Sequence, residues 1–310
     1  MPDPGVAMQR QIELIGAAWG LGGANPGCAD APGRLIPLVE ARLRACGAST
    51  LEGAILTPFP SERRKQLAVS RLCARLGAVV AHARREGRLP CVIGGDHSCA
   101  AGTWSGIART MHGQLGMVWV DAHMDAHTPG TSHSGRLHGM PLAWLLGEDD
   151  DPLYGLTSGV LDPAHVCLVG VRSFEPEEAA RLELLGVRVI HMAEIRRRGL
   201  DAALDEALAI ATDGTEAYGV SVDLDAITPE EAPGVGTPVK EGLSGQELAR
   251  GIANLGGNER LAGMELVEYV PKLDPDGRTA RIAVEIIASA LCGARQDPEV
   301  LADAIQGQHP

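Results

Sequence analysis

The chain has 310 residues, of which 45% are hydrophobic, and a formal net charge of −13 at pH 7. That length and apolar content suffice for a large buried core, and we expect one domain over residues 1–310. The acidic charge and the few aromatic residues (four Trp, three Tyr, two Phe) exclude a basic, base-stacking surface for nucleic acid. No apolar run approaches the roughly 20 residues that a membrane span needs.

The seven cysteines are odd in number and form no C-x-x-C pair. Cys91 and Cys167 lie inside apolar runs, where a small buried thiol is the usual interpretation. The first residues show no basic segment followed by an apolar one, which a secretory signal requires. These features predict a reduced protein of the cytoplasm.

Short apolar runs alternate with segments of helical periodicity along the whole chain. The expected strands are 12–17, 90–93, 116–120, 166–171, 187–191, 217–222 and 261–267. The expected helices lie near 61–86, 99–110, 139–146, 176–185, 199–212, 244–255 and 278–293. We expect a surface loop over 148–163, and either a frayed tail or an assembly contact over 295–310. The alternation predicts an α/β fold with a mainly parallel sheet covered on both faces.

Three of the strand-like runs end in side chains that bind hard metal ions. The motifs are Gly94-Gly95-Asp96-His97, Asp121-Ala122-His123-Met124-Asp125 and Asp223-Leu224-Asp225. Ligands of open parallel sheets bind beyond the carboxyl ends of the strands, so these motifs are expected to meet there. In an extended segment alternate residues point to one side, which would let Asp121, His123 and Asp125 project together, and likewise Asp223 and Asp225.

Four carboxylates and two imidazoles make a ligand set that suits Mn²⁺ and, without thiolates, does not suit structural zinc. So many carboxylates can bridge two ions, which then lie roughly 3.5–4 Å apart and ionise a shared water. Taken singly, each motif is also compatible with a helix cap or a water-binding loop. Their recurrence in similar contexts favours a two-metal hydrolase.

At these residues the chain resembles the ureohydrolase family, which includes arginases, agmatinases and related guanidino hydrolases. The matching segments are GGDHS (94–98), DAHMD (121–125), SGRLHG (134–139), SVDLDAITP (221–229), APGVGTP (232–238) and MELVEY around Glu268. The resemblance implies a three-layer, arginase-like α/β/α fold and a binuclear manganese site, whose ligands also suit Co²⁺ or Fe²⁺. It also implies a small guanidino substrate and assembly into homo-trimers or hexamers.

The resemblance assigns a role to each residue of the centre. One ion would be held by His97, Asp121, Asp125 and Asp223, and the other by His123, Asp121, Asp223 and Asp225. The bridging hydroxide would attack the guanidinium carbon and release urea and an amine. Asp125 would orient the hydroxide, His138 would pass a proton to the leaving amine, and Glu268 would pair with the guanidinium. Without the family, His138 is a loop or capping residue and Glu268 an ion-paired or surface glutamate.

The segment SGRLHG resembles the arginase form of this loop, which reads the α-carboxylate of the substrate; agmatinases have Gly-Thr after the histidine. The matching pocket residues are Ser134, Glu175, Glu178 and Thr237, each of which is otherwise a polar loop residue. Typical arginases carry Asn where this chain has His127 and Arg136. Arg136 either binds the α-carboxylate more strongly than Asn or shortens the pocket for another acid. His127 either donates to the carboxylate or caps the loop.

We therefore expect manganese-dependent hydrolysis of L-arginine to L-ornithine and urea. The alternative is hydrolysis of another guanidino compound: N-hydroxy-L-arginine, 4-guanidinobutyrate or agmatine. A catalytically silent relative is disfavoured because all six metal ligands are present.

Overall fold

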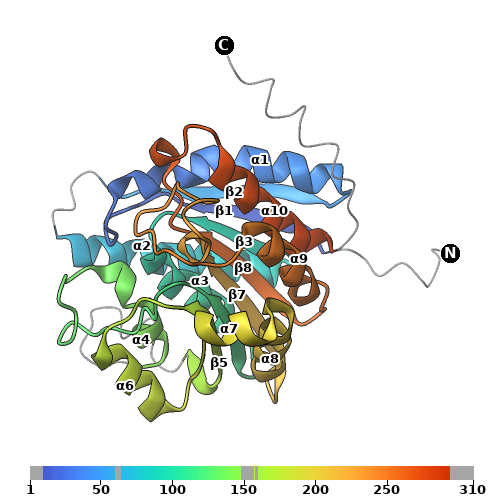
Figure 1. Cartoon of the computed structure of the whole chain (residues 1–310). Helices are drawn as coiled ribbons and strands as arrows, with labels where there is room; N and C mark the ends of the chain where they lie inside the picture. Colours follow the sequence, from blue (N-terminus) through green and yellow to red (C-terminus); the bar gives the residue numbers. More distant parts are fainter. Residues whose placement is uncertain (1–9, 60–63, 148–156, 158–159, 294–310) are drawn as a thin grey trace.

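The computed structural model describes residues 10–59, 64–147, 157 and 160–293. Within these residues eight strands form one parallel sheet in the order β2-β1-β3-β8-β7-β4-β5-β6 (Figure 1). The strands are β1 (Ile12–Ala17), β2 (Thr50–Leu56), β3 (Leu89–Gly94), β4 (Leu115–Val120), β5 (Leu161–Val171), β6 (Arg188–His191), β7 (Ala217–Asp223) and β8 (Leu261–Val267).

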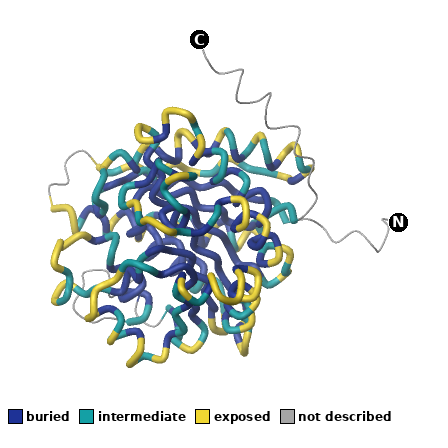
Figure 2. The backbone as a smooth tube through the Cα atoms, viewed as in Figure 1, coloured by how far each residue is buried: buried dark blue, intermediate teal, exposed yellow. Residues whose placement is uncertain are grey.

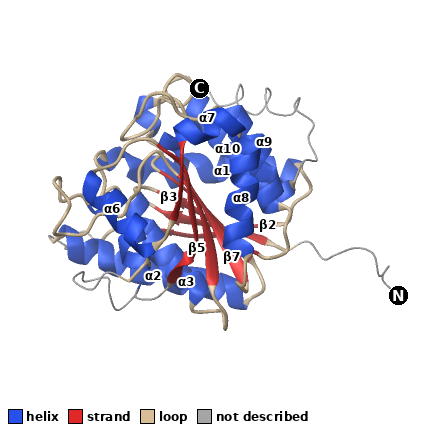
Figure 3. Ribbon diagram, turned by 60° about the horizontal axis from the view of Figure 1, so that its bottom comes forward, coloured by secondary structure: helices blue, strands red, loops and turns tan. Residues whose placement is uncertain are grey.

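Helices cover both faces of the sheet, as Figure 3 shows. One face packs against α1 (Ala31–Ala45), α7 (Met192–Arg198), α8 (Leu200–Thr212), α9 (Gly245–Gly256) and α10 (Arg278–Cys292). The other packs against α2 (Lys65–Arg85), α3 (Ala100–Ala108), α4 (Pro141–Leu145) and α6 (Pro176–Leu185). The predicted three-layer α/β/α architecture is confirmed.

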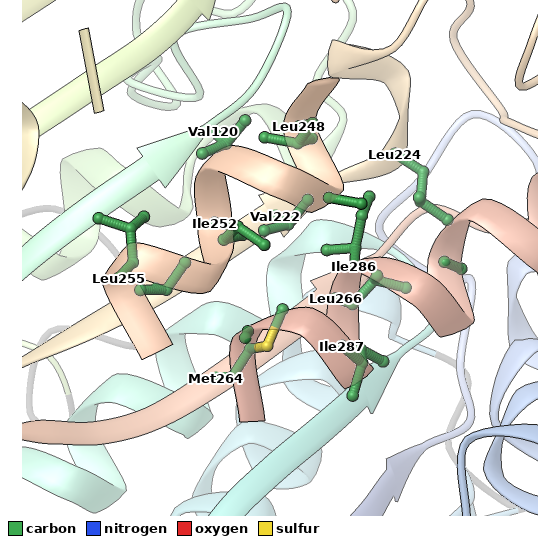
Figure 4. Packing of buried hydrophobic residues seen from close by; sticks show 14 of the residues in the cluster. Val120, Val222, Leu224, Leu248, Ile252, Leu255, Met264, Leu266, Ile286 and Ile287 are labelled. Carbon is green, nitrogen blue, oxygen red and sulfur yellow. The ribbon is translucent and has the colours of Figure 1, made fainter. Parts of the chain in front are cut away.

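The central strands lie in the most buried part of the molecule (Figure 2). Every residue of β3, β4, β7 and β8 is buried, which explains why the sequences of these strands are mainly apolar, with Ser221 and Glu265 as buried polar exceptions inside β7 and β8. On one face, Leu248 and Ile252 of α9 and Ile286 of α10 share a cluster with Val222 and Leu266 of the sheet (Figure 4). This packing gives the ends of the central strands a rigid support.

All seven predicted strands and the seven predicted helices are present, with ends displaced by a few residues. Among the α-helices and strands of the described residues, three were not predicted: α1, β2 and α7. α1 contains Pro37 in its interior, which obscures the helical pattern. β2 is an edge strand, paired with β1 alone, and its partly exposed sequence TLEGAIL lacks an apolar run.

The predicted loop over 148–163 was too long at its end, because Leu161 already begins β5. Residues 148–156 and 158–159 lie outside the described residues, as does the predicted tail over 295–310. None of the helices in the described ranges combines the length and apolar character that crossing a membrane requires.

Candidate metal centre

Four neighbouring strands in the middle of the sheet supply the predicted ligands. β3, β8, β7 and β4 lie side by side in that order, and all run in the same direction. His97 follows β3, Asp121 follows β4, Asp223 ends β7, and Glu268 follows β8. Residues from 97 to 268 therefore meet at one edge of the sheet, the usual place for a site in this class of fold.

The ligand motifs are compact turns and not the extended segments that we expected. In each, an aspartate at the strand end accepts a hydrogen bond from the backbone N–H two residues later. The acceptor carboxylates are those of Asp96, Asp121 and Asp223, and the N···O distances are 3.1, 2.7 and 2.8 Å. The expectation that the ligands align by alternation along an extended segment is wrong. In each motif the chain turns around the aspartate carboxylate, and this turn brings the next ligand to the same point.

One ligand group surrounds the imidazole of His97, which is fully buried. Its Nδ1 atom lies 3.0 Å from Oδ2 of Asp125, 3.2 Å from Oδ2 of Asp223 and 3.3 Å from Oδ2 of Asp121. The ring stacks on Trp119, with the ring centroids 4.4 Å apart. Four donor atoms from three strand ends thus converge on one small volume.

A second group adjoins the first and shares Asp121 with it. Nδ1 of His123 lies 3.1 Å from Oδ2 of Asp225 and 3.5 Å from Oδ1 of Asp121. The two oxygens of Asp121 thus face different histidines, as expected of a carboxylate that bridges two ions.

The buried carboxylates lie close together, so their mutual repulsion favours positive charge beside them. Burial and the neighbouring Asp121 raise the pKa of Asp125 to about 6. Burial, together with Asp225 and Asp121, raises the pKa of Asp223 well above its usual range. Burial opposes a charged imidazole, yet the surrounding carboxylates still raise the pKa of His97 well above its ordinary value. A buried anionic cluster of this kind is stabilised by bound cations.

The donor atoms fit divalent metal ions. Nδ1 of His97 is completely buried and has no hydrogen-bond partner in the described structure, although carboxylate oxygens surround it. When the imidazole is neutral with its proton on Nε2, this nitrogen has a lone pair for a metal. The residues that would hold two ions are the six predicted ones: His97, Asp121, His123, Asp125, Asp223 and Asp225.

Beside this cluster lies a charged pair formed by Glu268 and His138. Nδ1 of His138 lies 2.9 Å from Oε1 of Glu268, which also accepts the backbone N–H of His97 at 2.9 Å. Burial would lower the pKa of His138, but the Glu268 carboxylate raises it to about 9. Burial likewise opposes ionisation of Glu268, yet the pair with His138 holds its pKa below the usual range. Glu268 is therefore a buried carboxylate and not a surface residue.

Asp125 and Glu268 both have a left-handed backbone, with φ of 49° and 67°. Residues other than glycine rarely adopt this conformation, and it costs on the order of 1 kcal/mol. Among the other described residues that are not glycine, only Glu241 has a left-handed backbone. Two of three such backbones thus lie at the candidate centre, which is typical of functional sites.

The predicted substrate residues His127, Glu175 and Glu178 also meet. Nε2 of His127 lies 3.0 Å from Oε2 of Glu175 and 3.3 Å from Oε2 of Glu178, and Nδ1 lies 3.1 Å from the Thr131 hydroxyl. Both ring nitrogens thus have partners in the protein. Glu178 is buried and accepts the backbone N–H of Ala126, whereas Glu175 is exposed. Glu178 therefore supports the loop that carries Asp125, and Glu175 faces solvent.

The remaining predicted residues lie in two places, Thr237 beside a ligand and Ser134 and Arg136 at an exposed cavity. Thr237 donates a hydrogen bond of 2.8 Å to Oδ2 of Asp225. Ser134 and Arg136 are exposed and line a cavity of about 560 Å³ together with Gly22 and Lys65. None of the six candidate ligands lines this cavity.

Three neighbours of the centre were not identified from the sequence. Ser221 contacts Nε2 of His97 at 3.0 Å, Cys28 contacts Oε2 of Glu268 at 3.4 Å, and Trp119 donates to Oδ2 of Asp121 at 3.0 Å. Ser221 and Trp119 lie in strands that end in ligand motifs, which is the signal that could have indicated them. Cys28 lies in a 3₁₀ helix far away in the chain and has no such signal.

Known proteins resemble this chain in sequence and in fold. A model of the arginase family matches residues 10–293. An arginase of Brevibacillus brevis is 35% identical over 292 residues, which are 91% of this chain and 98% of that protein. The native structure of an arginase from Bacillus caldovelox has a TM-score of 0.86 at 33% identity, covering 91% of this chain and 98% of that one. The Entamoeba histolytica arginase, crystallised with L-ornithine, has a TM-score of 0.85 at 27% identity, covering 92% and 99%. The chain belongs to the arginase family.

Proposed function

We propose that this protein hydrolyses L-arginine to L-ornithine and urea at a centre of two divalent ions, with Mn²⁺ as the ion that best suits the ligands. The observation that carries the proposal is the sharing of Asp121 between two adjacent ligand groups, with Glu268 and His138 beside them. Four carboxylates and two imidazoles exceed what one ion ordinarily takes. When bound, two ions would supply an ionised water as the nucleophile.

Glu268 is the group proposed to hold the substrate guanidinium. It is fully buried, and its carboxylate lies beside the ligand His97, whose backbone N–H it accepts. A planar guanidinium binds a carboxylate through two parallel N–H donors, which fixes its orientation as well as its position. The reacting carbon would thereby be held next to the metal ligands.

Protons are handled by two further residues in this proposal. Asp125 would accept a hydrogen bond from the attacking oxygen, because its carboxylate belongs to the His97 group. His138 would give a proton to the leaving amine nitrogen, since a histidine whose pKa is raised to about 9 carries that proton at neutral pH. Once the amine is protonated, the carbon–nitrogen bond breaks and urea is left.

The amino-acid end of the substrate would lie near Glu175, Ser134 and Arg136. Glu175 is an exposed carboxylate suited to an α-ammonium group, and Ser134 and Arg136 offer donors for an α-carboxylate. The bound L-ornithine of the Entamoeba relative supports an amino acid as product. Hydrolysis of N-hydroxy-L-arginine, 4-guanidinobutyrate or agmatine is the competing function. The proposal also places the enzyme in the cytoplasm as a trimer or hexamer, on the resemblance of its motifs to the family.

The test is urea release by Mn²⁺-loaded protein with L-arginine, N-hydroxy-L-arginine, agmatine and 4-guanidinobutyrate as separate substrates. We expect the highest kcat/KM for L-arginine. A preference for another compound would support hydrolysis of a guanidinium group but would refute L-arginine as the substrate. No urea from any of them, with two metal equivalents verified, would refute the hydrolase assignment. Protein treated with chelator is the control, and Asp223→Asn is the matched variant without a full ligand set.

A further inference from the structure

Glu265 is a buried carboxylate for which the proposed reaction has no use. It lies in the middle of β8, is fully buried, and points into the apolar layer beneath α3. Within the described residues it forms no salt bridge with Lys or Arg. A carboxylate is rarely kept in such a place without a role, because burying it costs several kcal/mol unless polar partners compensate.

The partners of Glu265 are all hydrogen-bond donors. Ser221, its cross-strand neighbour on β7, donates from Oγ to Oε1 at 3.1 Å. Thr103 donates from its hydroxyl to Oε2, and Cys99 donates from Sγ to the same oxygen at 3.4 Å. When Glu265 is ionised, its carboxylate accepts from all three neighbours, and every shared proton belongs to the neighbour.

Ser221 links this carboxylate to the candidate metal centre. Its Oγ also lies 3.0 Å from Nε2 of His97. A hydroxyl has one proton, and Ser221 gives it to Glu265, so its oxygen accepts from His97. The neutral imidazole, which is the form that binds a metal ion, must then carry its proton on Nε2. Its Nδ1 atom, which faces the carboxylates of Asp121 and Asp125 and has no hydrogen-bond partner, is left with a free lone pair.

We propose that Glu265 is a positioning residue for the metal centre and acts through Ser221. It selects the tautomer of His97 that can bind a metal through Nδ1, and it holds the ring in place from the side opposite the ion. Stacking on Trp119 fixes the plane of the ring, and the chain His97–Ser221–Glu265 fixes its rotation within that plane. This inference rests on the proposed function, since it assumes that His97 holds an ion.

The test is Mn²⁺ binding to metal-free protein, measured by titration calorimetry. In Glu265→Gln and in Ser221→Ala we expect one of the two equivalents to bind about 10–100-fold more weakly, because removing the partner of a metal-bound histidine has this effect. The other equivalent should keep its affinity within about threefold, since His123 is not in the chain of hydrogen bonds. The variant His123→Asn, which removes a ligand of the other ion, identifies the equivalent that His97 holds.

A double-mutant cycle separates positioning from a general loss of structure. If Glu265 acts through Ser221, the double variant should bind the His97-side ion no more than about threefold worse than Ser221→Ala alone. Ser105→Ala is the matched control, because it removes another buried hydroxyl from the same layer, one that donates to Ala101. It should leave both affinities unchanged, and thermal unfolding should show that all variants are folded.

Three results would overturn the inference. Unchanged Mn²⁺ affinities in folded Glu265→Gln would show that the carboxylate has no positioning role. Fully additive effects in the double variant would show that it does not act through Ser221. Equal losses at both equivalents would indicate a merely structural role. In each case the wild type still binds two ions, so the proposed function stands. A wild type that binds no Mn²⁺ would refute the proposed function as well, and so the two failures are distinguishable.

Discussion

Nδ1 of His138 lies 2.9 Å from Oε1 of Glu268, although the two residues are 130 positions apart in the chain. The contact joins the loop after β4 to the end of β8 and places a proton donor next to the proposed guanidinium-binding carboxylate. Because both side chains are largely buried, removing one partner leaves the other without a counter-charge, and the charge state of the pair sets how stability depends on pH.

Replacing His138 by Gln should destabilise the metal-free protein by about 1–3 kcal/mol near neutral pH. The pKa of His138 is raised from an ordinary 6.5 to about 9 in the folded protein. A raised histidine pKa gives stability that is complete below pH 6.5 and is lost as the pH rises through about 9. Urea unfolding near pH 6 and again at about pH 10 checks this. An equal difference between wild type and variant at both pH values would contradict the charged pair.

Replacing Glu268 by Gln should lower kcat/KM for the guanidino substrate by about 10²–10³-fold, because the amide cannot form the bidentate charged pair. The side chain belongs to neither ligand group, so the variant should still bind two metal equivalents. Metal content by atomic absorption, measured on the same sample as urea release, distinguishes the two effects. Loss of a metal equivalent together with activity would assign Glu268 a different role.

Removal of the metal should lower thermal stability. Asp121, Asp125 and Asp223 are buried within reach of His97, and bound cations relieve the repulsion among them. An ion at 100 times its Kd adds about 2.7 kcal/mol to the free energy of unfolding. Thermal unfolding with Mn²⁺ or with chelator should therefore differ by several degrees. In Asp223→Asn, the shift caused by Mn²⁺ should become much smaller; an undiminished shift would place the ions elsewhere.

Replacing Arg136 by Ala should weaken recognition of the α-carboxylate and leave the chemistry intact. Arg136 is exposed and lines a cavity with Ser134, and we propose that its guanidinium meets the carboxylate of the substrate there. We expect KM for L-arginine to rise about tenfold, which is about 1.4 kcal/mol, with kcat nearly constant. Agmatine, which lacks the carboxylate, is the control and should show no such change. Equal changes with both substrates would argue against carboxylate recognition.

The parallel strands and the ligand residues could be predicted from the sequence for one reason. β3, β4, β7 and β8 are buried on both faces, so their apolar runs stand out, and each is followed by a polar ligand motif or, for β8, by Glu268. α1 and β2 lack such a pattern: proline interrupts the helix, and one side of the edge strand is exposed. The geometry within the motifs was mistaken because the turn at Asp121 depends on a side-chain hydrogen bond, which periodicity does not report.

The sequence by itself determined the kind of fold, the set of carboxylates and imidazoles, and the end of each strand at which they lie, since these depend on local pattern and residue chemistry. Only the tertiary structure decided that β3, β8, β7 and β4 are neighbours, and hence that His97, Asp223 and Glu268 meet. It also decided that His127 is paired with Glu175 and that Glu265 reaches His97 through Ser221. Such contacts join residues far apart in the chain, and they depend on strand order and side-chain packing, which local pattern does not encode.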